Sequence, residues 1–129
     1  DGIVVTPVGN SDDEITAMAV DSEGRILAAG YASGTAGRVV TIGRYLPDGT
    51  LDASFGDQGL TLTGIGSDAL ARSLVMDSAG RIVVVGSYIE SNQTGFFLLR
   101  YLETGDPDSS FGTGGVAVPV DAQALNEGY

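Results

Sequence analysis

The stretch that decides the fold is DSEGRILAAG at residues 21–30, because it returns as DSAGRIVVVG at residues 77–86, an offset of 56. At the same offset, GRYLPDGTLDASFGDQG at 43–59 returns as LRYLETGDPDSSFGTGG at 99–115. Self-similarity at a fixed period is the signature of a repeat protein, in which each cycle folds into the same unit. The chain is therefore predicted to contain two copies of one structural unit.

Each cycle holds four short apolar runs that are separated by turn sequences. Val, Ile, Phe, Tyr and Thr dominate these runs, and lengths of four to eight residues are typical of β-strands. The runs are ITAMAV (15–20), RILAAGY (25–31), VVTIGRYL (39–46) and LTLT (60–63) in the first cycle, and ARSLVM (71–76), RIVVVGSY (81–88), FFLLRYL (96–102) and VAVPV (116–120) in the second. Two sets of four strands are expected.

The turns between these runs have recognisable chemistry. In DSEG and DSAG, Asp21 and Asp77 are expected to accept backbone N–H hydrogen bonds, and Gly24 and Gly80 to adopt a positive φ. Pro47 presets φ for a further turn at PDG. One segment is ambiguous, because SDALARSLVM at 67–76 could also form a capped helix. Its counterpart DDEITAMAV contains β-branched residues, so a strand is predicted for both copies.

Four strands per cycle at this period favour a β-propeller blade, a twisted sheet that neighbouring blades cover on both faces. The continuously apolar runs VVTI, IVVV and FFLL fit such a sheet better than a sandwich, whose strands would alternate more. The expected fold is all-β, with two four-stranded antiparallel blades plus one extra strand. The predicted organisation is a leading strand of a preceding blade and a loop at 1–14, blade one at 15–66, blade two at 67–121 and a tail at 122–129.

The extra strand is the segment GIVVT at 2–6, which resembles GLTLT at 59–63 and GVAVP at 115–119. By analogy with other propellers, the strand before each DSxG turn is expected to be innermost and the GIVVT-like segment outermost. Because the chain opens with Asp1 and shows no signal peptide, it is expected to be processed or a piece of a longer array.

The paired motifs DSEGRILAAG with RYLPDGTLDASFGDQG, and DSAGRIVVVG with RYLETGDPDSSFGTGG, resemble the bacterial delta-60 repeat over nearly the whole chain. The resemblance implies a β-propeller without an assigned biochemical role, in large secreted or cell-surface proteins. An extracellular or cell-surface location is therefore expected. The family supplies no catalytic residues. The second copy departs from the pattern with ETG at 103–105 in place of PDG.

Composition excludes several classes of function. The 129 residues contain no Cys, His, Lys or Trp, which removes disulfides, thiolate or Ser–His nucleophiles and imidazole metal ligands. The net charge of −11 disfavours nucleic acid and anionic membrane surfaces as partners. No apolar run approaches the roughly 18 residues of a transmembrane helix, so no membrane insertion is expected.

One group of residues recurs at the same place in both cycles and is interpreted as structural. Arg44 and Arg100 are expected to bond a nearby carboxylate, with Asp52 and Asp108 as plausible partners. Each Asp is followed by Ser-Phe-Gly, where it would accept a backbone N–H two residues on. Phe55 and its copy Phe111 are both expected to be buried, and Tyr45 and Tyr101 to pack between blades.

The loops that differ between the cycles contain the candidate ligand-binding residues. The segments 31–38 and 87–95 are interpreted as connections between strands, with either an ordinary hydrophilic role or a role in binding a sugar or peptide. The candidates are Tyr31, Tyr88, Glu90, Asn92 and Gln93.

Acidic residues provide weak calcium candidates at two places, since hard cations take six to eight oxygen ligands. These are Asp12, Asp13 and Glu14 in the loop NSDDE, and Asp106 and Asp108 in DPD. A solvated loop is the preferred interpretation of both segments, and no cofactor is expected.

The leading hypothesis is a non-enzymatic interaction or scaffold module. A carbohydrate-binding module and a glycan-acting enzyme that uses only carboxylates are the alternatives. The expected partners are other propeller blades, in the same parent chain or by self-association, and a glycan or protein ligand.

Overall fold

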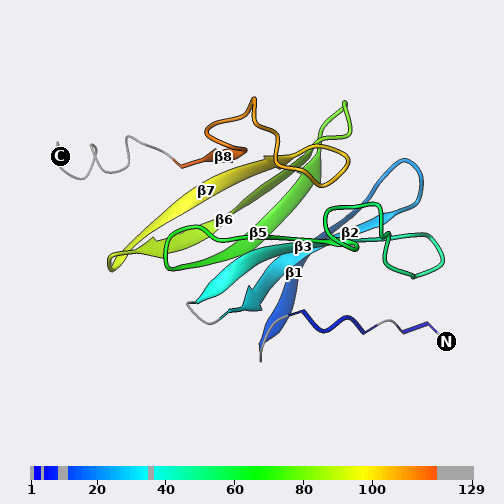
Figure 1. Ribbon diagram of the computed structural model, residues 1–129, viewed down its shortest axis with the longest axis horizontal. Helices are drawn as coiled ribbons and strands as arrows, with labels where there is room; N and C mark the ends of the chain where they lie inside the picture. Colours follow the sequence, from blue (N-terminus) through cyan, green and yellow to red (C-terminus); the bar gives the residue numbers. More distant parts are fainter. Residues whose placement is uncertain (1, 4, 9–11, 35–36, 119–129) are drawn as a thin grey trace.

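Two four-stranded antiparallel sheets form the fold in the computed structural model, which describes residues 2–3, 5–8, 12–34 and 37–118 (Figure 1). The strands of blade one are β1 (Asp13–Val20), β2 (Ile26–Ser33), β3 (Arg38–Tyr45) and β4 (Leu60–Thr63), and those of blade two are β5 (Asp68–Met76), β6 (Ile82–Glu90), β7 (Gln93–Tyr101) and β8 (Val116–Ala117). In each sheet the strands lie in chain order. The all-β prediction is confirmed. The predicted tail at 122–129 lies outside the described residues.

The ambiguous segment at 67–76 is a strand, as predicted. It forms β5, which pairs with β6 from Asp68 opposite Ile89 to Met76 opposite Ile82. Both copies carry a bulge at the same place, between Ile15 and Ala17 in β1 and at the matching position of β5. Among the described residues no helix is long and apolar enough to cross a membrane.

The DSxG turns have the predicted conformation. Gly24 has a φ of 81° and Gly80 a φ of 79°, a region that glycine reaches without steric cost. The Asp21 carboxylate accepts hydrogen bonds from the backbone N–H groups of Glu23 and Arg25, both at 2.9 Å. Each turn is therefore closed by its own aspartate.

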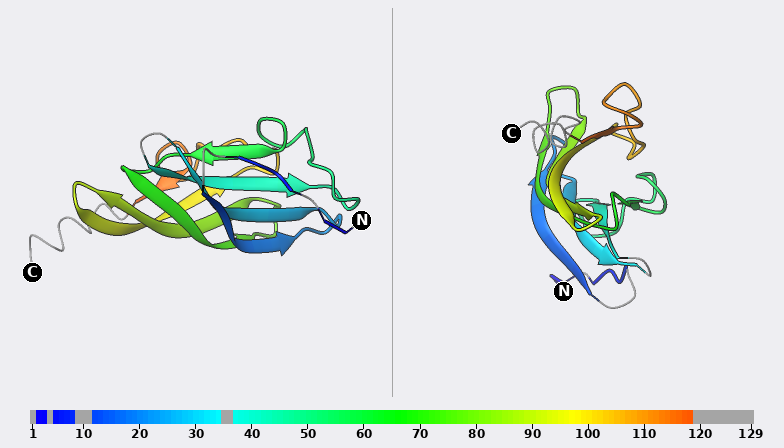
Figure 2. Two further views of the ribbon diagram at one scale, coloured as in Figure 1. Left: turned by 90° about the horizontal axis from the view of Figure 1, so that it is seen from below. Right: turned by 90° about the vertical axis from the view of Figure 1, so that its left-hand side faces the viewer.

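The core lies between the two sheets, which pack against one another (Figure 2). One side of the core consists of Leu27, Ala29, Val40 and Ile42 from β2 and β3, and the other of Ile82, Val84, Phe97 and Leu99 from β6 and β7. All eight are at most 1% exposed. The first strands of the two sheets, β1 and β5, also contact each other, as expected of the inner strands of neighbouring blades.

The predicted leading strand at 2–6 is wrong as a strand. The described residues of this segment have no ladder partner, and Ile3 and Val5 are 80% and 82% exposed. A strand needs a neighbouring strand for its backbone hydrogen bonds, and the described residues offer none at this place. The segment nevertheless occupies the expected place, because the Thr6 hydroxyl lies 2.6 Å from the Tyr45 hydroxyl. Thr63 and Tyr101 make the matching contact between blade one and blade two.

The expectation that both motif phenylalanines are buried is correct for Phe55 and wrong for Phe111. Phe55 is 0% exposed, because the turn of blade two that contains Gly105 covers it. Phe111 occupies the same position in blade two and is only half-buried. Its cover would have to come from a following blade.

We predict that Phe55→Ala lowers the free energy of unfolding by about 3–5 kcal/mol, the usual cost of truncating a buried aromatic residue. Phe111→Ala is the matched control. It should lower the free energy of unfolding by only about 1–2 kcal/mol, because the half-buried Phe111 side chain removes less apolar area from water on folding. Urea denaturation of the two variants measures the difference. Equal losses would contradict the assignment of Phe55 to the interface between the blades.

Candidate functional site

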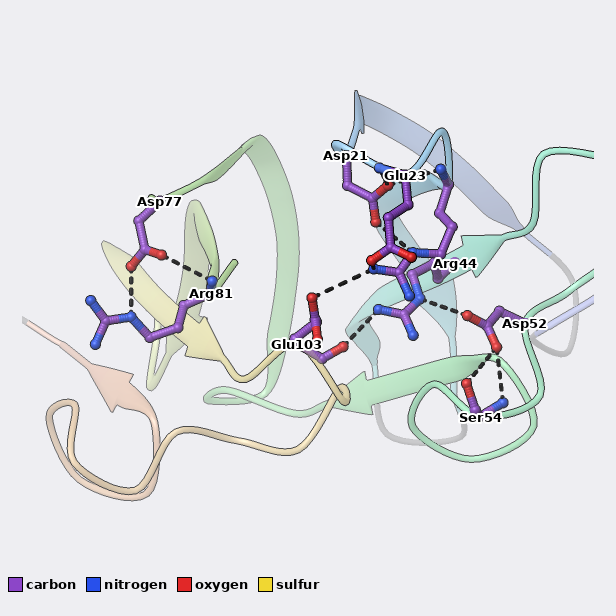
Figure 3. Close-up of polar contacts among 9 residues, drawn as sticks. Asp21, Glu23, Arg44, Asp52, Ser54, Asp77, Arg81 and Glu103 are labelled. Carbon is purple, nitrogen blue, oxygen red and sulfur yellow. Dashed lines mark hydrogen bonds and ion pairs between the residues drawn. The ribbon is translucent and has the colours of Figure 1, made fainter. Parts of the chain in front are cut away.

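A cluster of charged residues lies where the DSxG turns of the two blades meet (Figure 3). At the start of β2, the Arg25 guanidinium donates through Nε to Asp21 Oδ2 at 2.7 Å. It also lies 3.5 Å from Glu103 Oε2, which belongs to blade two. The corresponding pair in blade two, Asp77 and Arg81, repeats the 2.7 Å hydrogen bond.

Near the end of β3, Arg44 links its own strand to the turn that contains Asp52 and Phe55 and to blade two. Its Nε donates to Asp52 Oδ2 at 2.9 Å, and its Nη1 donates to the Glu103 carbonyl oxygen of blade two at 2.7 Å. The guanidinium lies 4.6 Å above the Phe55 ring, within the range of a cation–π contact. Asp52 Oδ1 accepts from the Ser54 backbone N–H at 3.1 Å and from its hydroxyl at 2.6 Å. The predicted partner of Arg44 and the predicted turn are both confirmed.

Blade two repeats this arrangement, and no further blade follows it among the described residues. Arg100 Nε donates to Asp108 Oδ2 at 2.8 Å, and Asp108 accepts from Ser110. The guanidinium lies 4.6 Å above the Phe111 ring. The side chain of Arg100 is 20% exposed, whereas that of Arg44 is 4% exposed. Arg44 is less exposed because blade two lies against it.

The carboxylates of the cluster are stabilised as anions. Hydrogen bonds from the Ser54 hydroxyl and backbone, together with Arg44, hold the pKa of Asp52 below its usual value. Burial alone would raise the pKa of Asp21, but the hydrogen bonds from Arg25 outweigh it and the pKa is lowered. A cavity of about 230 Å³ opens beside these residues. Each of these carboxylates forms an ion pair with an arginine of its own blade, and we call each such Arg–Asp pair a clamp. The clamps are Asp21–Arg25, Arg44–Asp52, Asp77–Arg81 and Arg100–Asp108.

Two of the ligand-binding candidates are half-buried. Tyr31 lies on β2, and the Arg38 guanidinium covers its ring at 5.1 Å from the centroid. Arg38 Nε in turn donates to Asp68 Oδ1 of blade two at 2.9 Å. Tyr88 lies on β6, packs against the core and lies beside Gly95. These contacts explain both tyrosines as parts of the junction between the blades.

The prediction that 87–95 is a loop is wrong. Most of the segment belongs to β6 and β7, which pair up to Glu90 opposite Gln93. Only Ser91 and Asn92 form the connection, with φ values of 51° and 65°. Two central residues of positive φ define the tight hairpin turn that matches the twist of the strands, and Asn tolerates this region well. The first loop, predicted at 31–38, is shorter too, because β2 runs to Ser33 and β3 begins at Arg38. Glu90 and Gln93 are exposed.

The calcium candidates are placed apart by the fold. Asp108 is engaged by Arg100 and Ser110, and Asp106 accepts from the Thr104 hydroxyl at 3.1 Å. Asp13 Oδ2 accepts from the Val8 backbone N–H at 2.9 Å, while the neighbouring Asp12 and Glu14 are exposed. In the described part of the chain, no three acidic residues converge on a point that could hold a metal ion. The loop residues 10 and 11 lie outside that part.

Comparison with known proteins places the chain in a family. A family model described as "Domain of unknown function (DUF5122) beta-propeller" matches residues 22–55 and 80–111, just over half of the chain. The chain belongs to this DUF5122 β-propeller family. The two matched segments begin in the DSxG turns and end at Phe55 and Phe111. The first contains the pair Arg44–Asp52 and the second the pair Arg100–Asp108. The comparison with curated proteins found no match.

Several residues that join these DUF5122 blades were missed by sequence reasoning. The Asp21–Arg25 pair has a local signal, since the same spacing returns in the second cycle as Asp77–Arg81. The cross-blade pair of Arg38 with Asp68 has no such signal. Its partners lie far apart in the sequence, and the pair does not recur, because Thr94 stands in blade two where blade one has Arg38.

We predict that Asp52→Asn lowers the free energy of unfolding at pH 7 by about 2–3 kcal/mol, because a buried guanidinium loses its anionic partner. A carboxyl whose pKa is lowered by folding stabilises the protein above its unfolded pKa of about 3.9, and this stability is lost as the pH falls through the folded pKa. The unfolding free energy of the variant should therefore fall less steeply below pH 4.

Chemical denaturation between pH 3 and pH 7 measures both effects. Asp57→Asn is the matched control, because Asp57 is exposed in the same loop. A pH profile of Asp52→Asn that runs parallel to the wild-type profile would contradict the role given to the clamp.

Proposed function

We propose that this chain is a non-enzymatic interaction or scaffold module of a secreted or cell-surface bacterial protein, and that it acts through the open faces of its blades. The resemblance to the delta-60 repeat supports the extracellular location. The clamps support a structural role for the recurring charges, because the four aspartates at 21, 52, 77 and 108 are all bonded to arginines of their own blade.

The observation that carries the proposal is the exposure of apolar residues on the two outer faces. Phe96 of blade two is 54% exposed, whereas its counterpart Val40 in blade one is 0% exposed under blade two. On the other outer face, Met18 is 60% exposed, whereas its counterpart Leu74 is 6% exposed. Contiguous exposed apolar surface on a soluble domain marks a site of interaction.

The two alternatives have less support. A sugar-binding site commonly presents an aromatic face, but Tyr31 and Tyr88 are packed into the junction between the blades. Hydrolysis by carboxylates needs a facing pair that is free to exchange protons. The carboxylates of the clamps are held as anions by arginines and hydroxyls instead.

We predict that the isolated chain associates at low micromolar concentration, which native mass spectrometry would measure. A 13.1 kDa monomer with a cooperative melt would contradict the proposed function. A glycan array and a panel of chromogenic glycosides test the alternatives. Specific glycan binding, or turnover abolished by a single Asp→Ala or Glu→Ala change, would overturn the proposal in favour of one of them.

A further inference from the structure

Each blade has one covered and one open face, and the open faces differ in size. The trailing face is the open face of blade two and consists of Val83, Val85, Phe96 and Leu98. The leading face is the face of blade one that is turned away from blade two, and it consists of Ile26, Ala28, Thr41 and Gly43. Thr41 is 9% exposed, because Thr6 and Val8 lie on the other side of the same hollow. Cross-strand pairing places the members of each set on one side of their sheet. Their counterparts in the other blade form the existing interface (Figure 1).

The side chains at the centre of the trailing face are larger than those at the corresponding positions of blade one. Val85 and Phe96 stand where blade one has Ala29 and Val40, both 0% exposed. At the ends of the same face the trend reverses, since Val83 replaces Leu27. The trailing face therefore has a central ridge that the corresponding face of blade one lacks.

The side chains of the leading face are smaller than those at the corresponding positions of blade two. Thr41 and Gly43 stand where blade two has the buried Phe97 and Leu99, and Ala28 stands in place of Val84. A hollow of about 340 Å³ remains there, lined by Ala28, Thr41 and Gly43 among others. In the existing interface the small residues are on the face of blade one that corresponds to the trailing face, and the large ones are on the face of blade two that corresponds to the leading face. At the open faces the large residues are on the trailing face and the small ones on the leading face, so the bulk of Phe96 complements the hollow.

Charged residues can also pair at the open faces, by analogy with the ion pair of the existing interface. In the existing interface Arg38 of blade one binds Asp68 of blade two. At the open faces Asp12 stands in place of Asp68, and Thr94 replaces Arg38. A different arginine is available, because Arg72 of blade two is exposed and makes no ion pair among the described residues.

The position of Arg72 lets it take over this role. Its counterpart Thr16, at the bulge of β1, reaches across to the Ala71 carbonyl oxygen of blade two at 2.7 Å. At a matching contact Arg72 would reach the carbonyl of Ile15, next to the acidic stretch at 12–14. A cation of the trailing blade would again lie beside an anion of the leading blade, as Arg38 and Asp68 do in the existing interface.

Other contacts across the existing interface use backbone acceptors. Arg44 donates to the Glu103 carbonyl oxygen, and the Gly56 N–H donates to the Thr104 carbonyl oxygen at 2.8 Å. The corresponding donors on the trailing face are Arg100 and Gly112, and the corresponding acceptors are the carbonyls of residues 47 and 48. Since every residue supplies a carbonyl, these bonds can form again.

We propose that the trailing face of one chain packs head to tail on the leading face of a second copy, with Phe96 in the hollow at Thr41 and Gly43 and Arg72 facing residues 12–14. This inference rests on the proposed function, since it specifies which surfaces meet. The described residues of 2–6 lie in the place that the outermost strand of the partner would take. Displacing this segment would break the contact between the Thr6 and Tyr45 hydroxyls, whereas Ile3 and Val5, which are 80% and 82% exposed, contribute little packing.

Two single-face variants test the head-to-tail arrangement. Phe96→Asp disables the trailing face and Met18→Asp disables the leading face, both at exposed positions that leave the core intact. Ala53→Asp, on an exposed loop, is the control for the added charge. The net charge of −11 opposes association, so the measurements need at least about 0.15 M salt. Far-UV circular dichroism checks the fold.

Each variant alone should associate at least about 30-fold more weakly than the wild type, the effect of losing a central apolar anchor. An equimolar mixture should form a heterodimer, because one competent face of each kind remains. A wild-type chain that stays monomeric contradicts the proposed function itself. Full association of either variant alone, or a mixture that stays monomeric, contradicts only the head-to-tail pairing.

A second experiment tests the match in size. Phe96→Val should weaken association at least about tenfold, and adding Thr41→Phe should restore it. The trailing and leading faces would then carry a valine and a phenylalanine, as the two faces of the existing interface do at Val40 and Phe97. Arg72→Gln should weaken association, whereas Ala53→Asp, which makes the net charge more negative by the same single unit on an exposed loop, should not. Absence of rescue by Thr41→Phe, or equal effects of Arg72→Gln and Ala53→Asp, would overturn the proposed fit.

Discussion

The sheet of blade one buries its apolar residues because the sheet of blade two lies against them, and this dependence on a neighbour explains most differences between the two repeats. Phe55 and Phe111 stand in the same motif, yet only Phe55 is covered. Arg44 is enclosed, whereas Arg100 retains an exposed side chain. In a repeat protein, stability is a sum of terms for each unit and for each interface between neighbours. Here the described residues contain one such interface between two blades.

Two kinds of polar contact hold that interface together, and they have different sequence requirements. Bonds to the carbonyl oxygens of Ala71, Glu103 and Thr104 require only a donor in the right place, so any blade of this geometry can accept them. The pair of Arg38 with Asp68 is specific to this interface. The first kind fixes how blades stack in general, and the second distinguishes one neighbour from another.

The recurring aspartates and arginines pair with each other within each blade, and the two outer surfaces of the blades differ in shape. The central ridge at Phe96 and the hollow at Thr41 and Gly43 break the symmetry between the repeats at the positions where blades meet. The negative charge of the whole chain discourages indiscriminate association. A contact that forms in spite of it must be well matched.

The sequence by itself determined the repeat, the strands and the turns, because these depend on groups that are close along the chain. The Asp21 turn and the pair of Arg44 with Asp52 span four and eight residues and appear twice, so their spacing was visible. The segment 67–76 matched both a helix and a strand, and pairing with β6 decided in favour of the strand.

Only the tertiary structure decided which copy of a repeated residue is buried, which tyrosine is packed and which segment becomes a strand. Phe111 and the segment 2–6 carry the same local signals as Phe55 and β4, yet the described residues contain no neighbouring sheet that would cover or pair them. The physical reason is that turn hydrogen bonds close within a few residues, whereas burial depends on which surfaces meet, and no local pattern records that.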